Sequence, residues 1–172
     1  IAPGLRRTFS FEEWNWIDNR LIQEVRTEAS KKINRDLVLD IMGTDIDARM
    51  VEIAKENAQK AGVASDITFK QMRVQDLRSD KINGVIISNP PYGERLSDDA
   101  GVTKLYAEMG EVFEPLKTWS KFILTSDENF EKKFGRQADK KRKLYNGTLK
   151  VDLYQFFGER VRRQATSEKG NI

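Results

Sequence analysis

The sequence predicts an α/β fold with a doubly wound, mostly parallel sheet that ends in an antiparallel hairpin. Strand-like and helix-like segments alternate from Leu37 to Phe134, which is typical of parallel strands joined by crossover helices. The run Val85–Ile87 is apolar on successive residues, as expected for an inner strand that is covered on both faces. Asn146–Gly147 lies between two alternating segments and predicts a hairpin turn.

The N-terminal part of the chain is predicted to be a loop followed by a long helix. Residues 1–9 form the loop, and Ser10 and Glu13 have the spacing of a capping box, in which each side chain bonds the other's backbone amide. Apolar residues then recur at steps of three and four, which indicates one buried stripe on a helix of about six turns. The stripe comprises Phe11, Trp14, Ile17, Leu21, Val25, Ala29 and Ile33.

The middle of the chain is predicted to supply the remaining strands and helices of the alternation. A strand over residues 37–45 ends in Asp45, and the helix after it has Asp47 as its N-cap and Gly62 as its stop. The other elements follow in order: strands at 67–71 and 82–88, a helix at 105–116, a strand at 119–125 and a short helix at 128–134.

Composition excludes several functional classes. The chain has no cysteine and no histidine, which excludes thiolate and imidazole metal ligands, a cysteine nucleophile and a histidine base, and no metal site is expected. No apolar run approaches the ~20 residues of a membrane span, and no signal sequence follows Ile1. We therefore expect a cytoplasmic protein and, because the first residue is not methionine, a piece of a longer one.

Basic residues are unevenly distributed along a chain whose net charge is only +3. Lys140–Lys143 form a run of four, and Arg160, Arg162 and Arg163 follow near the end. Runs this short are common on solvated surfaces, and they also suit contact with the phosphates of a nucleic acid. The charge pattern alone leaves both interpretations open.

Three of the predicted strands lead into acidic or amide side chains. Asp45 ends the first, Asp76 lies shortly after the second, and Asn89 ends the third. Open parallel sheets bind ligands at the carboxyl ends of their strands, where an acid can accept hydrogen bonds from ribose hydroxyls. A second acid can accept the exocyclic amine of adenine. The ordered set therefore favours a ligand that contains adenosine, although each acid by itself could be a cap or a turn residue.

The segment Asn89-Pro90-Pro91-Tyr92 has the properties of a clamp for an aromatic amine. Its two prolines end the strand and stiffen the loop. Hydrogen bonds from the amine to the Asn89 side chain and the Pro90 carbonyl would make the nitrogen more tetrahedral and aim its lone pair at an electrophilic methyl group. Tyr92 can stack on a base that is unpaired or flipped out. Catalysis would then rest on positioning and electrostatics, without a strong base.

Several segments together resemble a known family. The sequence resembles Rossmann-like, S-adenosylmethionine-dependent amino methyltransferases, which carry an (Asn/Asp/Ser)-Pro-Pro-(Tyr/Phe/Trp) motif. More narrowly, it is similar to the bacterial 23S ribosomal RNA guanine-N2 methyltransferases that pair this domain with an N-terminal THUMP RNA-binding domain and were often described as N6-adenine-specific DNA methylases. The similarity spans nearly the whole chain and rests on Ala2–Arg7, Gly43–Asp47, Asn89–Arg95 and Arg142–Gly147.

This resemblance implies a cofactor, a substrate and a set of site residues. S-adenosylmethionine would place its ribose at Asp45 and its adenine at Asp76, with Asp45, Ile46, Asp76, Leu77 and Asn89 as the cofactor-binding residues. The target amine would meet the catalytic residues Asn89, Pro90, Pro91 and Tyr92. The implied function is methylation of guanine N2 in large-subunit ribosomal RNA, and the candidates for phosphate contact are Arg95, Lys141, Arg142 and Lys143.

One feature of that family does not occur in the sequence. Its first motif, a strand and a Gly-rich loop of Asp-Pro-x-Cys-Gly-Ser-Gly type, should lie just before Ile1. We therefore expect a partial methyltransferase domain over residues 1–163, without its central first strand, and a flexible tail over residues 164–172. The isolated segment is expected to bind S-adenosylmethionine weakly or not at all, to be inactive, and to self-associate across the gap.

Three alternative functions stay open. N6-adenine methylation of DNA would use the same amide and carbonyl clamp, so the motif does not separate it from RNA methylation. A non-catalytic nucleic-acid-binding module that retained the fold would be favoured if the loss of the Gly-rich loop were natural. A nucleotide-dependent oxidoreductase has the least support, because the sequence contains no G-x-G-x-x-G motif.

Overall fold

The computed structural model describes residues 1–92 and 99–160. They belong to two compact units, Ile1–Arg73 and Val74 onward, and each unit has its own sheet. The fold is mixed α/β with parallel and antiparallel strands, which confirms the predicted class. In the described residues the strands form a sheet of two and a sheet of four.

The single long N-terminal helix predicted from the apolar spacing is wrong. The chain instead forms two short 3₁₀ turns and one α-helix: η1 (Pro3–Arg6), η2 (Ser10–Glu13) and α1 (Asn19–Lys31). Asp18 begins α1 because its Oδ1 accepts the backbone N–H of Arg20 at 2.8 Å. The residues between η2 and α1 include Trp14 and Trp16, whose ring centroids lie 5.3 Å apart. The two tryptophan rings contact each other, and the N-cap at Asp18 starts the helix. The segment before Asp18 is therefore not part of α1, although its apolar residues have helical spacing.

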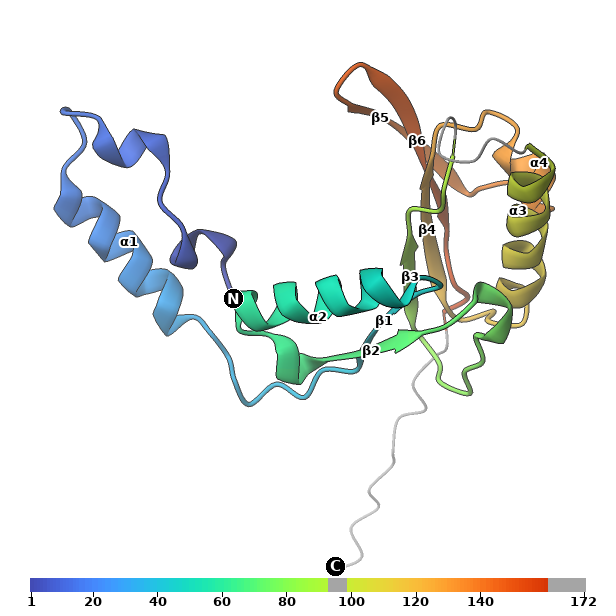
Figure 1. Ribbon diagram of the computed structural model, residues 1–172, viewed down its shortest axis with the longest axis horizontal. Coiled ribbons are helices and arrows are strands. Elements are labelled where there is room, and N and C mark those ends of the chain that lie inside the picture. The colour runs from blue at the N-terminus through green and yellow to red at the C-terminus, as the bar shows by residue number, and fades with distance from the viewer. Residues whose placement is uncertain (93–98, 161–172) are drawn as a thin grey trace, which may run out of the picture. The chain divides into compact units, whose positions relative to one another are not determined.

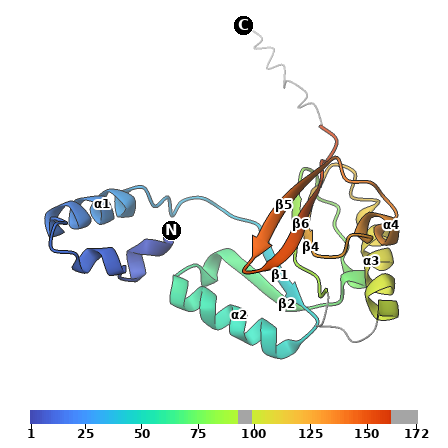
Figure 2. The same ribbon diagram turned by 90° about the horizontal axis from the view of Figure 1, so that it is seen from above.

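The first unit contains one parallel pair of strands and the helix that connects them. β1 (Ile41–Asp45) and β2 (Ile67–Gln71) pair from Ile41 to Asp45, and α2 (Ala48–Ala61) packs on both strands, with η3 (Ala64–Asp66) leading into β2 (Figures 1 and 2). The predicted cap and stop of α2 are confirmed. Asp47 Oδ1 accepts the backbone N–H of Arg49 at 2.9 Å, and Gly62 ends the helix at φ +69°.

The second unit contains a mixed sheet in the order β3-β4-β6-β5. β3 pairs parallel with β4, and the β4–β6 and β5–β6 pairs are antiparallel. The predicted hairpin is confirmed, with Gly147 at φ +63° in the turn between β5 and β6. The elements are η4 (Val74–Asp76), β3 (Val85–Ser88), α3 (Asp99–Phe113), β4 (Ser120–Thr125), α4 (Phe130–Phe134), β5 (Lys140–Asn146) and β6 (Leu149–Phe156).

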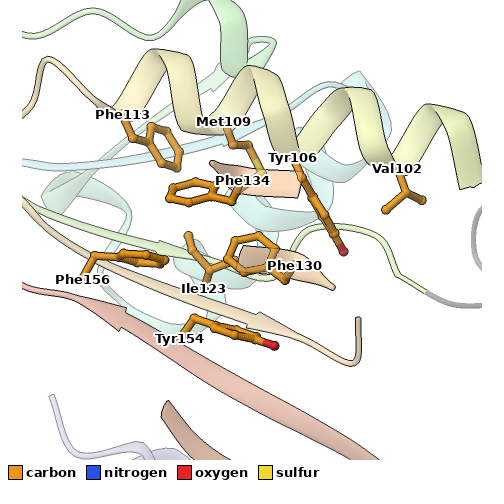
Figure 3. Packing of buried hydrophobic residues seen from close by; sticks show 9 residues of the cluster. All are labelled: Val102, Tyr106, Met109, Phe113, Ile123, Phe130, Phe134, Tyr154 and Phe156. Carbon is orange, nitrogen blue, oxygen red and sulfur yellow. The ribbon is translucent and has the colours of Figure 1, made fainter. Parts of the chain in front are cut away.

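The core of the second unit lies between α3, α4 and one face of its sheet. Side chains from α3 point toward the two rings of α4 and toward residues of β4 and β6 (Figure 3). Phe130 is fully buried at the centre, with its ring centroid 4.9 Å from that of Tyr106 and 4.8 Å from that of Tyr154. No helix within the described ranges is long and apolar enough to cross a membrane.

Candidate active site

The loop Asn89–Tyr92 begins where β3 ends. The last paired residue of β3, Ser88, lies opposite Ile123 of β4, and the two prolines that follow Asn89 cannot donate further ladder hydrogen bonds. Pro90 is buried, whereas Asn89 is exposed. The loop therefore offers the Asn89 amide to a ligand while its following residue is anchored in the protein.

Tyr92 is less accessible than its predicted role requires. Its side chain is 6% exposed, so a base that stacks on the ring must first gain access to it. Stacking on Tyr92 stays a prediction. The loop is held from inside the unit as well, because the Tyr106 hydroxyl of α3 lies 3.3 Å from the Pro91 carbonyl oxygen.

Asp76 and Leu77 belong to the same unit as this loop. Leu77 packs against the hydrophobic core, and its backbone N–H donates to the Val74 carbonyl at 3.1 Å. The Arg78 guanidinium donates to the Leu77 carbonyl at 2.7 Å and so ties the chain just after η4. Asp76 is exposed, and within the described residues its carboxylate has no hydrogen-bond or ion-pair partner. A fixed backbone and a free carboxylate are what an acceptor for an adenine amine requires.

Asp45 and Ile46 lie at the carboxyl end of β1, in the first unit. Asp45 Oδ1 accepts the backbone N–H of Asp47 at 2.8 Å, and the Ile46 carbonyl accepts from the Gln71 side chain at 3.0 Å. These bonds orient the turn after β1 without using both carboxylate oxygens of Asp45. Ile46 is 60% exposed and sets an apolar surface beside the acid. An oriented acid next to an exposed apolar side chain fits a ribose and the face of an adenine ring.

The predicted cofactor residues are divided between the two units. Asp45 and Ile46 are in the first, and Asp76, Leu77 and Asn89 are in the second. Within the second unit, η4 packs against α3, the helix that also supplies Tyr106. The structure thus places Asp76, Leu77 and the loop Asn89–Tyr92 on one scaffold.

The predicted phosphate-binding residues have different surroundings. Lys141 Nζ lies 3.0 Å from Glu131 Oε2 and 5.3 Å from the centre of the Tyr154 ring, so this lysine makes contacts within the protein. The pKa of Glu131 is lowered, chiefly by the backbone N–H of Ala138 and also by Lys141. A carboxylate that stays ionised in this way keeps Lys141 in place.

Arg142 and Lys143 are exposed on β5 and have no ion-pair partner within the described residues. They point to opposite faces of the sheet, because side chains alternate along a strand and their pairing partners are consecutive residues of β6, Leu153 and Asp152. Arg95 lies outside the described residues. The basic run Lys140–Lys143 is therefore split between two faces.

Sequence reasoning missed Tyr106 and Thr125, whose hydroxyl oxygens lie 2.9 Å apart beside the loop. Each sits inside an element that the sequence does predict, but their spacing along the chain does not show that they meet. The sequence indicates only that Tyr106 lies in a helix and that Thr125 ends the next strand. Ordinary core residues share both properties.

The chain matches a known family over most of its length. The family described as "RMKL-like, methyltransferase domain" matches residues 1–155. A protein of Bacillus subtilis named "Putative RNA methyltransferase YpsC" is 52% identical over 167 residues, which are 96% of this chain and 43% of that protein. A Shewanella amazonensis protein named "Ribosomal RNA large subunit methyltransferase K/L" is 38% identical over 183 residues, covering 100% of this chain and 26% of that protein.

Solved structures also match. A crystal structure described as "SMU.472, a putative methyltransferase complexed with SAH" has a TM-score of 0.87 and 62% identity, over 93% of this chain and 42% of that one. A Listeria monocytogenes protein described as "a predicted N6-adenine-specific DNA methylase" has a TM-score of 0.83 and 48% identity, over 92% of this chain and 41% of that one. This chain spans less than half the length of each of these four proteins.

Proposed function

The chain belongs to the RMKL-like methyltransferase domain family, and on that premise we propose that the complete protein methylates an exocyclic base amine in ribosomal RNA. The methyl donor is S-adenosylmethionine, and the target is guanine N2 of 23S RNA. The partner is therefore the large-subunit RNA, which an N-terminal RNA-binding domain of the complete protein helps to bind. The reaction takes place in the cytoplasm.

The observation that carries this proposal is the loop Asn89–Tyr92 at the end of β3. It presents an exposed side-chain amide directly before two proline carbonyls, on a scaffold with a packed aromatic core. An aromatic amine has its lone pair delocalised into the ring and is a weak nucleophile. Hydrogen bonds from its two protons to Asn89 Oδ1 and the Pro90 carbonyl favour a tetrahedral nitrogen and fix the direction of its lone pair.

Four residues are assigned to the cofactor in this proposal. Asp45 accepts the ribose hydroxyls, Ile46 contacts one face of the adenine, and Asp76 accepts the adenine amine beside Leu77. SAH, the compound bound to SMU.472, is what S-adenosylmethionine becomes when it loses its methyl group, and this supports the assignment. The bound cofactor supplies an electrophilic methyl group. After transfer the nitrogen is cationic and loses a proton readily, so no strong base from this chain is required.

The names of the relatives favour RNA over DNA as the substrate, and exposed basic residues suit the phosphates of either nucleic acid. The proteins from B. subtilis and S. amazonensis are both named as RNA methyltransferases. Exposed Arg142 and Lys143 suit phosphate contact, and we assign Arg95 the same role. Lys141 contributes by supporting the strand, because its ammonium already has a carboxylate partner. We assign residues 1–163 to the methyltransferase domain and propose that the isolated segment self-associates; the tail predicted over residues 164–172 lies outside the described residues.

N6-adenine methylation of DNA is the second candidate function, and the description of the Listeria protein favours it. The test is transfer of a tritiated methyl group by the complete protein to deproteinised ribosomal RNA and, separately, to duplex DNA. Label in the RNA supports the proposal, and label in the DNA alone supports the second candidate. No label in either substrate, from protein that binds S-adenosylmethionine, would support a non-catalytic binding module.

A further inference from the structure

We propose that Tyr106 is a positioning residue for methyl transfer, because its hydroxyl holds the Pro91 carbonyl and thereby fixes the loop that binds the target amine. This inference rests on the proposed function of Asn89–Tyr92. It adds a residue from α3 that the sequence motif does not contain, and it assigns Thr125 of β4 as the support of that residue.

The contact is made by groups buried inside the second unit. Tyr106 and Thr125 are both 0% exposed. The Tyr106 hydroxyl lies 3.3 Å from the Pro91 carbonyl oxygen and 2.9 Å from Thr125 Oγ1. Thr125 Oγ1 also accepts the backbone N–H of Asp127 at 3.1 Å. Three elements thus meet at one hydroxyl: the loop after β3, helix α3 and the end of β4.

The available protons fix the direction of this chain of hydrogen bonds. A carbonyl can only accept, so Tyr106 must donate its single proton to Pro91. Thr125 then donates its own proton to the Tyr106 oxygen and accepts from the backbone N–H of Asp127. Every donor and acceptor in the series has one consistent role. Removing the Tyr106 hydroxyl would leave the hydroxyl proton of Thr125 without its acceptor and the Pro91 carbonyl without its donor.

Tyr106 stays protonated, as a donor must, at any pH where the protein is assayed. Burial raises the pKa of its phenol, which the hydrogen bond with Thr125 partly opposes. Asp127, whose backbone N–H donates to Thr125, is held in turn because its carboxylate lies 2.9 Å from Lys133 Nζ on α4. The Pro91 carbonyl is therefore tied to the interior of the unit and not to another surface loop.

The hydrogen bond to the Pro91 carbonyl restricts the backbone rotation that the two prolines leave open. The proline rings fix φ at Pro90 and Pro91, and neither residue has an N–H that could hold the backbone. The orientation of the Pro91 carbonyl sets the ψ angle of Pro91. Because Tyr106 occupies this carbonyl, the neighbouring Pro90 carbonyl is the acceptor left for the target amine. Misplacement of reacting groups by about 1 Å can cost ~10²-fold in rate, so this restriction bears directly on catalysis.

The first experiment compares Tyr106→Phe with Tyr154→Phe in the complete protein. Tyr154 is a matched control, because its buried hydroxyl also donates to a backbone carbonyl, that of Asp127 at 3.1 Å, but does not contact the loop. We expect Tyr106→Phe to lower the single-turnover rate of methyl transfer by about 10- to 100-fold, with the dissociation constant for S-adenosylmethionine unchanged. Tyr154→Phe should lower the thermal midpoint similarly and leave the rate unchanged. Equal rates for the two variants would overturn the inference.

The second experiment observes the hydrogen bond itself and does not depend on activity. Pro91–Tyr92 is the only Pro–Tyr pair in these 172 residues, so labelling proline carbonyls with carbon-13 and tyrosine amides with nitrogen-15 selects the Pro91 carbonyl. The peak that Pro91→Ala removes identifies it in the complete protein. Loss of a donor should move this carbonyl signal upfield in Tyr106→Phe, and less in Thr125→Val. An unchanged signal in Tyr106→Phe would contradict the contact.

The two experiments separate failure of this inference from failure of the proposed function. If the unmodified protein transfers no methyl group to RNA while the carbonyl signal moves in Tyr106→Phe, the proposed function fails and the hydrogen bond stands, but its catalytic role is refuted with it. If the unmodified protein is active and Tyr106→Phe matches Tyr154→Phe in rate, the proposed function stands and the positioning role of Tyr106 is overturned.

Discussion

The two units of the chain differ in how firmly they hold their parts of the site. In the second unit, the loop Asn89–Tyr92 contacts Tyr106 of α3, which belongs to a buried cluster between α3, α4 and one face of the sheet. In the first, Val51 and Ala58 are the only buried apolar residues in the part that the structure describes, whereas Val38 and Ile41 are exposed. The residues that we propose for the target amine therefore lie on a packed scaffold, whereas Asp45 lies in a unit with few buried apolar residues. Catalytic positioning depends on rigidity, and the loop that we propose as the clamp lies in the unit that has the larger buried core.

Truncating a core ring should show the largest effect of this difference. Phe130 is 0% exposed at the centre of the aromatic cluster, and Phe130→Ala should reduce the free energy of unfolding by about 3–5 kcal/mol. Leu21 in α1 is 58% exposed, and Leu21→Ala should cost under about 1 kcal/mol. Urea unfolding of the complete protein measures both losses. Equal losses would contradict the contrast between the units.

Removing the clamp amide should have the next largest effect, on the rate and not on stability. Asn89→Ala in the complete protein should lower the methyl-transfer rate by about 10²–10³-fold, because one acceptor for the target amine is lost. Its dissociation constant for S-adenosylmethionine should stay nearly the same. Asn57→Ala, at an exposed position of α2, is the matched control and should behave like the unmodified protein. A near-normal rate in Asn89→Ala would remove the clamp from the mechanism.

A substitution at Asp45, in the first unit, should weaken the affinity for S-adenosylmethionine. Asp45→Ala removes a charged acceptor of ribose hydroxyls, and we expect the dissociation constant for S-adenosylmethionine to rise about tenfold or more. Asp47→Ala is the control, because it removes the cap of α2 at a cost of about 1 kcal/mol and leaves the Asp45 carboxylate in place. Isothermal titration of the complete protein measures both. An Asp45→Ala variant with unchanged affinity would exclude the ribose contact.

The smallest effect is expected from substituting the exposed basic residues of β5, and it should appear in the affinity for RNA. Arg142→Gln should weaken RNA binding a few-fold and reduce the salt dependence of the affinity by about one counterion, as loss of one phosphate contact does. Lys141→Gln should instead lower the thermal midpoint, because Lys141 is paired with Glu131. Filter binding at several salt concentrations measures the first variant. If Lys141→Gln changes the salt dependence as much as Arg142→Gln, the proposed division of roles is wrong.

The sequence predicted most of the elements because their boundaries are set by local chemistry. Asp47 and Gly62 delimit α2, two prolines end β3, and a glycine after Asn146 forms the hairpin turn. The prediction of one long helix was wrong for the segment before α1, because the cap at Asp18 and contacts between aromatic rings, and not the apolar spacing, decide its structure. The helical spacing from Phe11 onward is real, but Asp18 starts the helix later, and the preceding aromatic residues pack on one another.

The sequence predicted the motifs of the candidate site, but it did not predict the hydrogen bonds and ion pairs that hold their residues in place. The spacing of Asp45, Asp76 and Asn89 follows the strand ends, so a pass along the chain finds them. That Lys141 is bound by Glu131 depends on a contact between α4 and β5, which no local pattern reports. The Tyr106–Pro91 hydrogen bond likewise joins residues that are close only after α3 has folded onto the sheet.

The position of the transferred methyl group tests the central claim most directly. The complete protein is incubated with S-adenosylmethionine and 23S ribosomal RNA, and the RNA is then digested to nucleosides and analysed by mass spectrometry. We predict N2-methylguanosine from the unmodified protein and none above background from Asn89→Ala. A methyl group on any other atom, or N2-methylguanosine formed equally by Asn89→Ala, would contradict the proposal that this loop presents a guanine amine for methylation.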